Sequence, residues 1–186
     1  MAWKIDPAHS QIEFSVKHMM ITTVRGRFAK FDGNITVNPR NLLQSSVEGT
    51  IEVDSVDTRD TNRDAHLRSA DFFDVEKFPT MSFRSTRIEK TGDDEYKVTG
   101  DLTIKDNTRP VTFTVTDDGK GKDPWGNQRW GLSGATTISR KDFGLTWNVA
   151  LESGGWLVGD QVKIQVDMEL VESAEETVTS ETAAQA

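Results

Sequence analysis

Apolar and polar residues alternate with a period of two along most of the chain, and this pattern restricts the fold more than any other feature. The positions between the apolar residues are largely Glu, Ser, Lys, Thr, Arg and Asp. A strand with this pattern buries one face and exposes the other to water, which is typical of antiparallel sheets. The sequence therefore predicts an all-β protein of about nine segments, with the apolar residues Ile12, Phe14 and Val16; Phe31, Ile35 and Val37; Val47, Ile51 and Val53; Met81 and Phe83; Tyr96, Val98, Leu102 and Ile104; Val111, Phe113 and Val115; Trp130, Leu132 and Ile138; Phe143, Leu145, Trp147 and Val149; and Val162, Ile164, Val166, Met168 and Leu170.

Turn-forming residues separate these segments, and helix signals are few. The turn signals are Asn38-Pro39, Gly92-Asp93-Asp94, Asp106-Asn107 and Asp117-Asp118-Gly119. The stretch Asp6-Pro7-Ala8-His9 predicts a single helical turn with Asp6 as its N-cap. One longer helix is expected from Thr58 to Ser69, with caps offered by Thr61, Asn62 and Asp64.

The number of strands leaves two all-β architectures, a two-sheet sandwich or a barrel. The glycines favour a barrel, because several lie on the apolar side of a strand pattern, where glycine marks a bend or a close approach. These glycines are Gly33, Gly49, Gly100 and Gly134. A barrel of about eight strands encloses a space that is either filled by side chains or able to hold one small ligand. The pattern alone leaves both alternatives open.

The composition excludes several classes of protein. The sequence has 0 cysteines, which excludes disulfide scaffolds, thiol chemistry and cysteine-bound zinc or iron–sulfur sites. Its 22 Lys and Arg against 30 Asp and Glu give a formal net charge of −8 without a basic cluster, so we expect no nucleic-acid partner. No run approaches the roughly 18 apolar residues of a membrane span, so we expect no transmembrane segment.

The chain of 186 residues suits one domain followed by a tail. We place the domain at residues 1–171 and an acidic, disordered tail at residues 172–186, where Glu and no basic residue lie among Ser, Thr and Ala. The start shows no charged segment followed by an apolar run, so we expect no signal peptide. As written, the sequence predicts a cytoplasmic protein, and removal of a signal ahead of Met1 would make it periplasmic or secreted.

The residues able to carry chemistry do not form a recognised catalytic or metal motif. His9, His18 and His66 lack the spacing of a metal site, so we expect neither a metal ion nor a cofactor. Ser133, in Gly131-Leu132-Ser133-Gly134-Ala135, lies between strand patterns and lacks the strand–turn–helix context of a nucleophile elbow.

The densest polar stretch runs from Ser55 to Ser69, where acids and bases alternate. One interpretation is a polar mouth that holds the head group of a ligand. The other is a capped helix pinned by ion pairs over one end of the sheet, in which Asp60 and Asp64 share Arg63 or Arg68.

A series of motifs extends in order from residue 6 to about residue 170. With x for any residue, they are Asp6-Pro7-Ala8-His9-Ser10-x-Ile12-x-Phe14-x-Val16-Lys17-His18-Met19, Val24-x-Gly26-x-Phe28-x-x-Phe31-x-Gly33, Ser55-Val56-Asp57-Thr58, Arg63-Asp64-x-His66-Leu67-Arg68-Ser69-x-Asp71-Phe72-Phe73-Asp74-Val75, Phe78-Pro79-Thr80-Met81-Ser82-Phe83-x-Ser85, Gly100-Asp101-Leu102-Thr103-Ile104, Arg109-Pro110-Val111, Ser139-Arg140-x-Asp142-Phe143-Gly144 and Val158-Gly159-Asp160. Taken together, they resemble the YceI-like family.

The resemblance implies a lipocalin-like antiparallel β-barrel with one short helix and an apolar lumen. It also implies a non-catalytic protein, often a homodimer and often periplasmic, that shields, stores or transports a polyisoprenoid or fatty-acid-derived lipid. We expect the lipid to contact Phe14, Val16, His18, Met20, Phe83, Leu102, Ile104, Phe113 and Trp147. The alternative is an enzyme acting on an isoprenoid-type lipid, with His18 as general base beside an acid such as Asp64 or Asp142.

Overall fold

The computed structural model describes residues 1–173 of the chain. Its strands are β1 (Ala2–Ile5), β2 (Gln11–His18), β3 (Thr22–Phe28), β4 (Phe31–Thr36), β5 (Ser46–Glu52), β6 (Val56–Asp57), β7 (Thr80–Lys90), β8 (Glu95–Ile104), β9 (Asn107–Lys122), β10 (Gln128–Ser139) and β11 (Val158–Ser173). The α-helix is α1 (Thr61–Arg68), and short 3₁₀ turns cover Pro7–His9, Leu42–Gln44, Val53–Ser55 and Arg140–Phe143. No helix within residues 1–173 is both long and apolar enough to span a bilayer.

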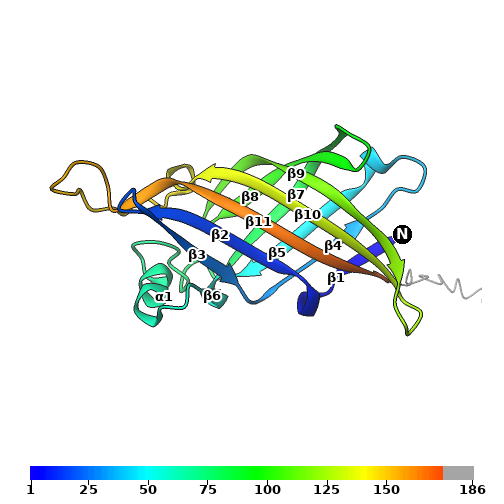
Figure 1. Ribbon diagram of the computed structural model, residues 1–186, viewed down its shortest axis with the longest axis horizontal. Coiled ribbons are helices and arrows are strands. Elements are labelled where there is room, and N and C mark those ends of the chain that lie inside the picture. Colours follow the sequence, from blue (N-terminus) through cyan, green and yellow to red (C-terminus); the bar gives the residue numbers. More distant parts are fainter. Residues whose placement is uncertain (174–186) are drawn as a thin grey trace, which may run out of the picture.

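The strands form a closed antiparallel barrel (Figure 1). Eight strands make the ring in the order β1-β4-β5-β7-β8-β9-β10-β11, and pairing of β1 with β11 closes it. The predicted lipocalin-like, all-β antiparallel barrel is therefore confirmed. Closure leaves few backbone groups unpaired at sheet edges, which would otherwise offer a template for aggregation.

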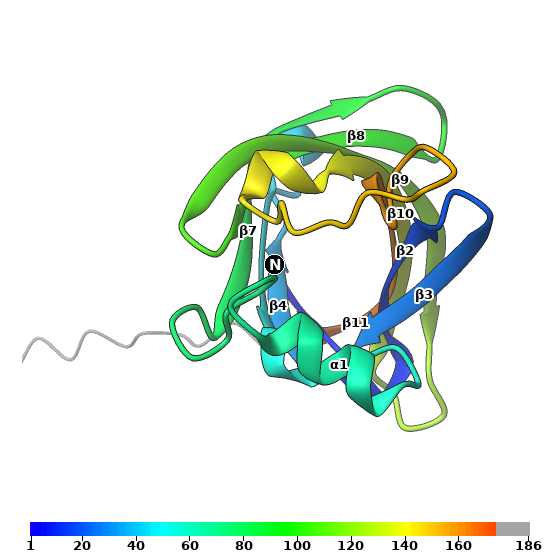
Figure 2. The same cartoon turned by 90° about the vertical axis from the view of Figure 1, so that its left-hand side faces the viewer.

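The two ends of the barrel differ because β11 pairs with two strands along one edge. Its C-terminal part pairs with β1, placing Leu170 opposite Ile5, and its N-terminal part pairs with β2, placing Val162 opposite Val16. Strands β3 and β6 extend the wall beyond β2. Helix α1 and the segment 144–157 lie at this end, which faces the viewer in Figure 2. We call it the mouth, and the end at β1 the floor.

The direction of side chains follows the predicted alternation. In β9, Val111 is buried and Phe113 is half-buried, whereas Thr112 and Thr114 between them are exposed. Gly100 provides the expected close approach, because a Cβ added there would lie 2.5 Å from the Phe83 ring. Only glycine leaves room for that ring inside the barrel.

The floor is a compact apolar cluster. Trp3, Ile35, Val37 and Leu170 are buried there, and the rings of Trp3 and Trp130 meet edge to face with their centroids 5.4 Å apart. Leu170 is 0% exposed, which shows that the floor is closed by packed side chains rather than by backbone alone.

Several sequence predictions were wrong in detail. The predicted strand containing Phe143, Leu145, Trp147 and Val149 is instead a 3₁₀ turn over Arg140–Phe143 followed by irregular chain. The predicted turn Asp117-Asp118-Gly119 is a β-bulge inside β9, because Leu132 pairs with Asp117 while Gly131 pairs with Gly119.

The longer helix is shorter than predicted and has a different cap. It covers Thr61–Arg68, and Asp60 is its N-cap, accepting a hydrogen bond from the backbone N–H of Arg63 at 3.0 Å. Asp60 and Asp64 do not share Arg63 or Arg68, because Arg68 pairs with Asp54 at 3.1 Å. The turn at Pro7–His9 is as predicted, with Asp6 as its N-cap.

The predicted domain ends at residue 171, whereas β11 continues through Glu172 and Ser173. Ser173 pairs with Ala2 and donates a hydrogen bond to the Ala2 carbonyl at 3.1 Å. The remainder of the predicted acidic tail, residues 174–186, lies outside the described residues.

Candidate functional site

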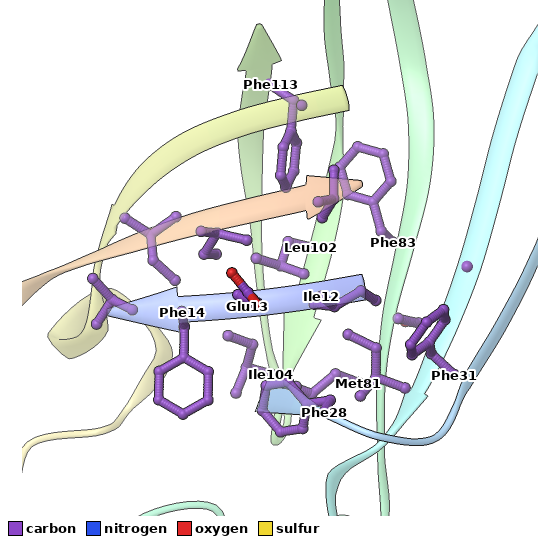
Figure 3. A pocket seen from close by; sticks show the side chains of 18 of the residues that line it. Ile12, Glu13, Phe14, Phe28, Phe31, Met81, Phe83, Leu102, Ile104 and Phe113 are labelled. Atoms are coloured by element: carbon purple, nitrogen blue, oxygen red, sulfur yellow. The ribbon is translucent and has the colours of Figure 1, made fainter. Parts of the chain in front are cut away.

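The barrel encloses a cavity of about 450 Å³. Its wall carries inward-facing side chains from most strands of the ring together with β2 and β3 (Figure 3). The lining includes Ile12, Phe14, Phe28, Met81, Phe83, Leu102, Ile104, Phe113, Val162 and Ile164. A volume of this size is in the range of roughly 300–1,000 Å³ found for small-molecule sites.

Aromatic rings line the cavity without filling it. Phe83 and Phe113 pack edge to face with ring centroids 5.4 Å apart, and Phe14 and Phe28 lie at the same separation in a tilted arrangement. The rings therefore stabilise one another against the wall, and the space between them remains open. Of the two alternatives left by the sequence, a filled barrel and an open lumen, the structure has the open lumen.

Gly49 marks unfilled space towards the floor. It pairs with Gly33 on one side and with Phe83 on the other, so it faces the same interior as the Phe83 ring. A Cβ added at Gly49 would meet only the Asp32 carbonyl oxygen, at 3.6 Å, which is an ordinary van der Waals contact. This part of the lumen is therefore wide enough to accept a side chain or part of a ligand.

The structure places eight of the nine predicted lipid-contacting residues on the cavity wall: Phe14, Val16, His18, Phe83, Leu102, Ile104, Phe113 and Trp147. Met20 is the exception, because it lies in the turn between β2 and β3 with φ +59° and is 67% exposed. The alternation of β2 ends at His18, so Met20 does not continue it into the lumen. Contact of these residues with a lipid stays a prediction.

A polar group at the mouth centres on Thr58. Its hydroxyl donates to the Asp64 carboxylate at 2.5 Å and accepts a hydrogen bond from Arg63 Nε at 2.8 Å. Arg63 Nη2 also donates to the Thr58 carbonyl at 2.8 Å. Asp64 is buried, and Arg63 and Thr58 both line the cavity. Within residues 1–173 no salt bridge joins a carboxylate to Arg63, so the cavity wall at the mouth carries a cation whose hydrogen-bond partners are the hydroxyl and carbonyl of Thr58.

Helix α1 meets the segment 144–157 through aromatic rings. The His66 ring lies edge-on to Trp147 with centroids 4.6 Å apart, and Phe72 is 5.4 Å from Trp147. His66 Nε2 is 2.9 Å from the Asp71 carboxylate, which fixes the orientation of the imidazole. The stretch 55–69 is therefore a capped helix held by ion pairs and hydrogen bonds at one end of the barrel, and binding of a ligand head group there stays a prediction.

Arg140 holds the base of the segment 144–157. Its guanidinium is buried and donates to the carbonyls of Leu145 at 2.6 Å, Trp147 at 2.9 Å and Gly159 at 2.8 Å. Burial lowers the pKa of Arg140, and the charge of nearby Asp160 opposes this shift. Because Arg140 takes the carbonyls of Leu145 and Trp147, these groups are not in a sheet ladder, which explains why the alternating sequence forms no strand here.

The predicted catalytic pair is not assembled. Among residues 1–173, no hydrogen bond or salt bridge joins His18 to Asp64 or Asp142. The Asp64 carboxylate instead accepts hydrogen bonds from the backbone and hydroxyl of Thr58.

Asp6, His9 and Glu169 bring three metal-type ligand atoms within 4.8 Å of one another on the outside of the floor. Arg129 already occupies this cluster, donating to Asp6 at 2.7 Å and to Glu169 at 3.0 Å. Its charge fills the role that a metal ion would have, so we assign the cluster to the structure of the floor.

Comparison with known proteins agrees with this geometry. A UPF0312 protein of Pseudomonas aeruginosa (strain LESB58) is 43% identical over 145 residues, which cover 77% of this chain and 75% of that protein. The crystal structure of Burkholderia cenocepacia BcnA superposes with a TM-score of 0.76 at 29% identity, over 89% of this chain and 98% of that chain. A polyisoprenoid binding domain from Saccharophagus degradans, implicated in plant cell wall breakdown, shares the fold with a TM-score of 0.68 at 12% identity, over 92% of this chain and 98% of that chain. The model of the YceI-like domain matches residues 3–170, and the chain therefore belongs to the YceI-like family.

Proposed function

We propose that this protein binds one long-chain amphiphilic lipid, polyisoprenoid or fatty-acid-derived, in the lumen of the barrel and thereby shields, stores or transports it. The observation that carries the proposal is the cavity of about 450 Å³ lined largely by Phe, Leu, Ile, Val and Met side chains. Each methylene moved from water into such a lining contributes about 0.8 kcal/mol, so an extended chain needs few polar contacts to bind tightly.

The two ends of the cavity support one orientation of the ligand. Packed side chains around Leu170 close the floor, so the apolar end of the chain lies there. The head group then lies at the mouth beside His18 and Arg63, both of which line the cavity. Because Arg63 has no carboxylate partner among residues 1–173, a carboxylate or phosphate head group complements it better than a neutral one.

Similarity to a solved polyisoprenoid binding domain supports lipid binding rather than catalysis. The solved Saccharophagus degradans domain with this fold is described as polyisoprenoid binding, and that ligand enters here as a proposal. Among residues 1–173 no hydrogen bond or salt bridge joins His18 to either candidate acid, so no assembled catalytic pair supports the enzyme alternative.

The test is mass spectrometry of an organic extract of the purified protein, followed by titration of the delipidated protein with a polyprenyl phosphate and with a long-chain fatty acid. We expect a long-chain lipid in the extract, saturable binding of at least one added lipid, and no turnover. Lipid-free extracts together with no binding of either probe would refute the proposal, and conversion of the polyprenyl phosphate would favour the enzyme.

A further inference from the structure

Exposed apolar side chains gather at the mouth of the barrel. They come from the turn between β2 and β3 and from the segment 144–157, and each is between 43% and 75% exposed. We call this group the apolar tip; it consists of Met19, Met20, Ile21, Val149 and Trp156. In Figure 1 the loop of the segment 144–157 projects beyond the strands at the end of the barrel that carries α1, and the turn between β2 and β3 lies at the same end. Large apolar side chains grouped in this way typically mark an interaction site.

The two segments of the apolar tip are joined to each other. The backbone N–H of Met19 donates to the Leu157 carbonyl at 2.7 Å, and the N–H of Leu157 donates to the Val149 carbonyl at 2.9 Å. The Met20 sulfur packs against Gly155, whose φ is +87°. The apolar tip is thus one built surface and not two unrelated loops.

The backbone of the turn holds these side chains outward. Met19 and Met20 have φ +52° and +59°, a left-handed conformation that is uncommon for residues with a side chain. Such a conformation costs energy and persists where the surrounding structure fixes it. Here the turn directs Met20 and Ile21 towards solvent instead of into the lumen.

The apolar tip is continuous with the cavity. His18, directly before Met19, lines the cavity, and so do Leu157 and Val158, directly after Trp156. Both segments therefore connect the apolar tip directly to residues of the cavity wall.

We propose that the apolar tip docks into the surface of a lipid bilayer, so that the mouth opens towards the membrane and a lipid chain passes into the barrel without crossing water. This inference rests on the proposed lipid-binding function. Release of the chain into water exposes every methylene at a cost in free energy, which makes passage through water slow for a long lipid. Direct contact between mouth and membrane removes that barrier.

A bilayer fits this surface better than a protein partner does. Trp favours the membrane–water interface, and small apolar insertions anchor peripheral proteins at the depth of the lipid head groups. A projecting tip of five side chains can sink into lipid, whereas five partly exposed side chains offer less than the area of about 800 Å² on each partner that a stable protein interface needs.

Trp125 provides a matched control. It lies in the turn between β9 and β10, where the backbone N–H donates to Asp123, and it is 82% exposed. This turn is near the floor, since Arg129 just after it pairs with Val171 of β11. Trp125 is thus the same residue type with greater exposure, far from the mouth.

The experiment compares the full-length protein, the double variant Ile21→Ser/Trp156→Ser and the control Trp125→Ser. Delipidated protein is floated with phosphatidylcholine vesicles, and transfer of a fluorescent long-chain fatty acid from these vesicles to the protein is timed. We expect wild type and Trp125→Ser to associate equally with vesicles, and the double variant to associate at least about tenfold less and to take up lipid more slowly. Affinity for the fatty acid supplied below its aggregation concentration stays unchanged.

Three results would overturn the proposal. The first is equal flotation and transfer by all three proteins. The second is loss of affinity for dispersed fatty acid in the double variant, which would make the apolar tip part of the binding site. The third is an apparent mass that falls from dimer to monomer in the double variant, which would assign the surface to a second copy of the chain. The single variant Met20→Ser repeats the comparison if the double variant does not show the wild-type circular dichroism spectrum.

Failure of the proposed function gives a different result. In that case none of the three proteins binds dispersed fatty acid or polyprenyl phosphate. Flotation still measures whether the apolar tip associates with vesicles.

Discussion

At the scale of single residues, the direction of a side chain in the barrel wall determines its role. Phe113 faces the lumen and contacts Phe83, while Thr114 beside it faces water. Alternation in the sequence identifies such pairs because successive side chains in a strand point to opposite faces.

Glutamate substitutions at these two positions should have opposite outcomes. Phe113→Glu places a carboxylate in an apolar lumen, so we expect it to lower the free energy of unfolding by several kcal/mol or to be protonated. Thr114→Glu leaves its charge in water and should change stability by at most about 0.5 kcal/mol. Denaturant unfolding of the delipidated variants measures both, and equal tolerance of glutamate at the two positions would contradict the assigned direction.

Gly49→Leu should shorten the lipid that the barrel accepts. The new side chain enters open space near the floor, where a Cβ has no contact closer than 3.6 Å, so the protein folds and the lumen loses volume. We expect the preferred fatty acid to become shorter by a few carbons in a chain-length series. The control is Gly121→Leu, where a Cβ has nothing within 4 Å and the residue does not line the cavity. An unchanged chain-length profile in Gly49→Leu would show that the chain does not reach this part of the lumen.

Arg63→Gln tests the position of the head group. Loss of the cation should weaken binding of a fatty acid about tenfold or more, the effect of one charge-assisted hydrogen bond, with little change for the corresponding fatty alcohol. Arg59→Gln is the control, because Arg59 is exposed and does not line the cavity. Competition titrations with the acid and the alcohol give the two affinities. Parallel losses for acid and alcohol would mean that Arg63 supports the wall rather than the head group.

The sequence identified most of the lumen side chains and missed those that depend on turns. Phe83, Leu102 and Phe113 follow from alternation alone. The prediction that Met20 lines the lumen was wrong because the turn after His18 adopts positive φ, a feature that no apolar pattern reveals. The proposal for Arg63 required knowledge of its hydrogen bonds to Thr58, which the sequence pattern does not reveal.

At the scale of elements, long strands were easier to predict than short strands or segments whose backbone is hydrogen-bonded to a side chain. Strand β1 has four residues, too few for a period to be evident, and the alternation of β3 is interrupted by Gly26, where a Cβ would collide with the Phe14 ring. The segment around Leu145 has the pattern of a strand, but its backbone carbonyl accepts a hydrogen bond from Arg140 instead of pairing in the sheet. A periodic pattern indicates which side chains are buried. It does not indicate which donor forms a hydrogen bond with a given backbone carbonyl.

The hairpin between β9 and β10 should lose stability in acid through Asp123. Its carboxylate accepts hydrogen bonds from the side chain and backbone of Asn127 and from Arg129, and these lower the pKa from 3.8 to about 2. A lowered pKa stabilises the fold above pH about 4, and that contribution is lost as the pH falls towards 2. Asp123→Asn removes this titration, so its free energy of unfolding should fall less steeply than that of wild type between pH 4 and 2. Chemical denaturation at several pH values measures this difference. An equally steep fall of the free energy of unfolding with pH in both proteins would contradict the role of Asp123.

At the scale of the whole molecule, a four-residue strand completes the barrel. β1 joins β4 to β11, and without it both strands would present open edges at the floor. It also carries Trp3, which is 3% exposed and packs on Trp130. The first strand and the last described strand therefore meet at the floor, where Ala2 pairs with Ser173.

Removing either end of the chain should have very different effects. Deletion of residues 1–5 opens the ring and removes the buried Trp3 side chain, whose loss alone costs about 3–5 kcal/mol, so we expect the melting temperature to fall by more than about 10 °C or the protein not to fold. Deletion of residues 174–186, an acidic stretch rich in Ser, Thr and Ala with little apolar area to bury, should shift it by no more than about 2 °C. Thermal unfolding followed by circular dichroism compares the two truncations with the full chain. A large drop after removal of residues 174–186 would mean that they pack against the barrel, and an unchanged midpoint without residues 1–5 would mean that closure by β1 does not stabilise the ring.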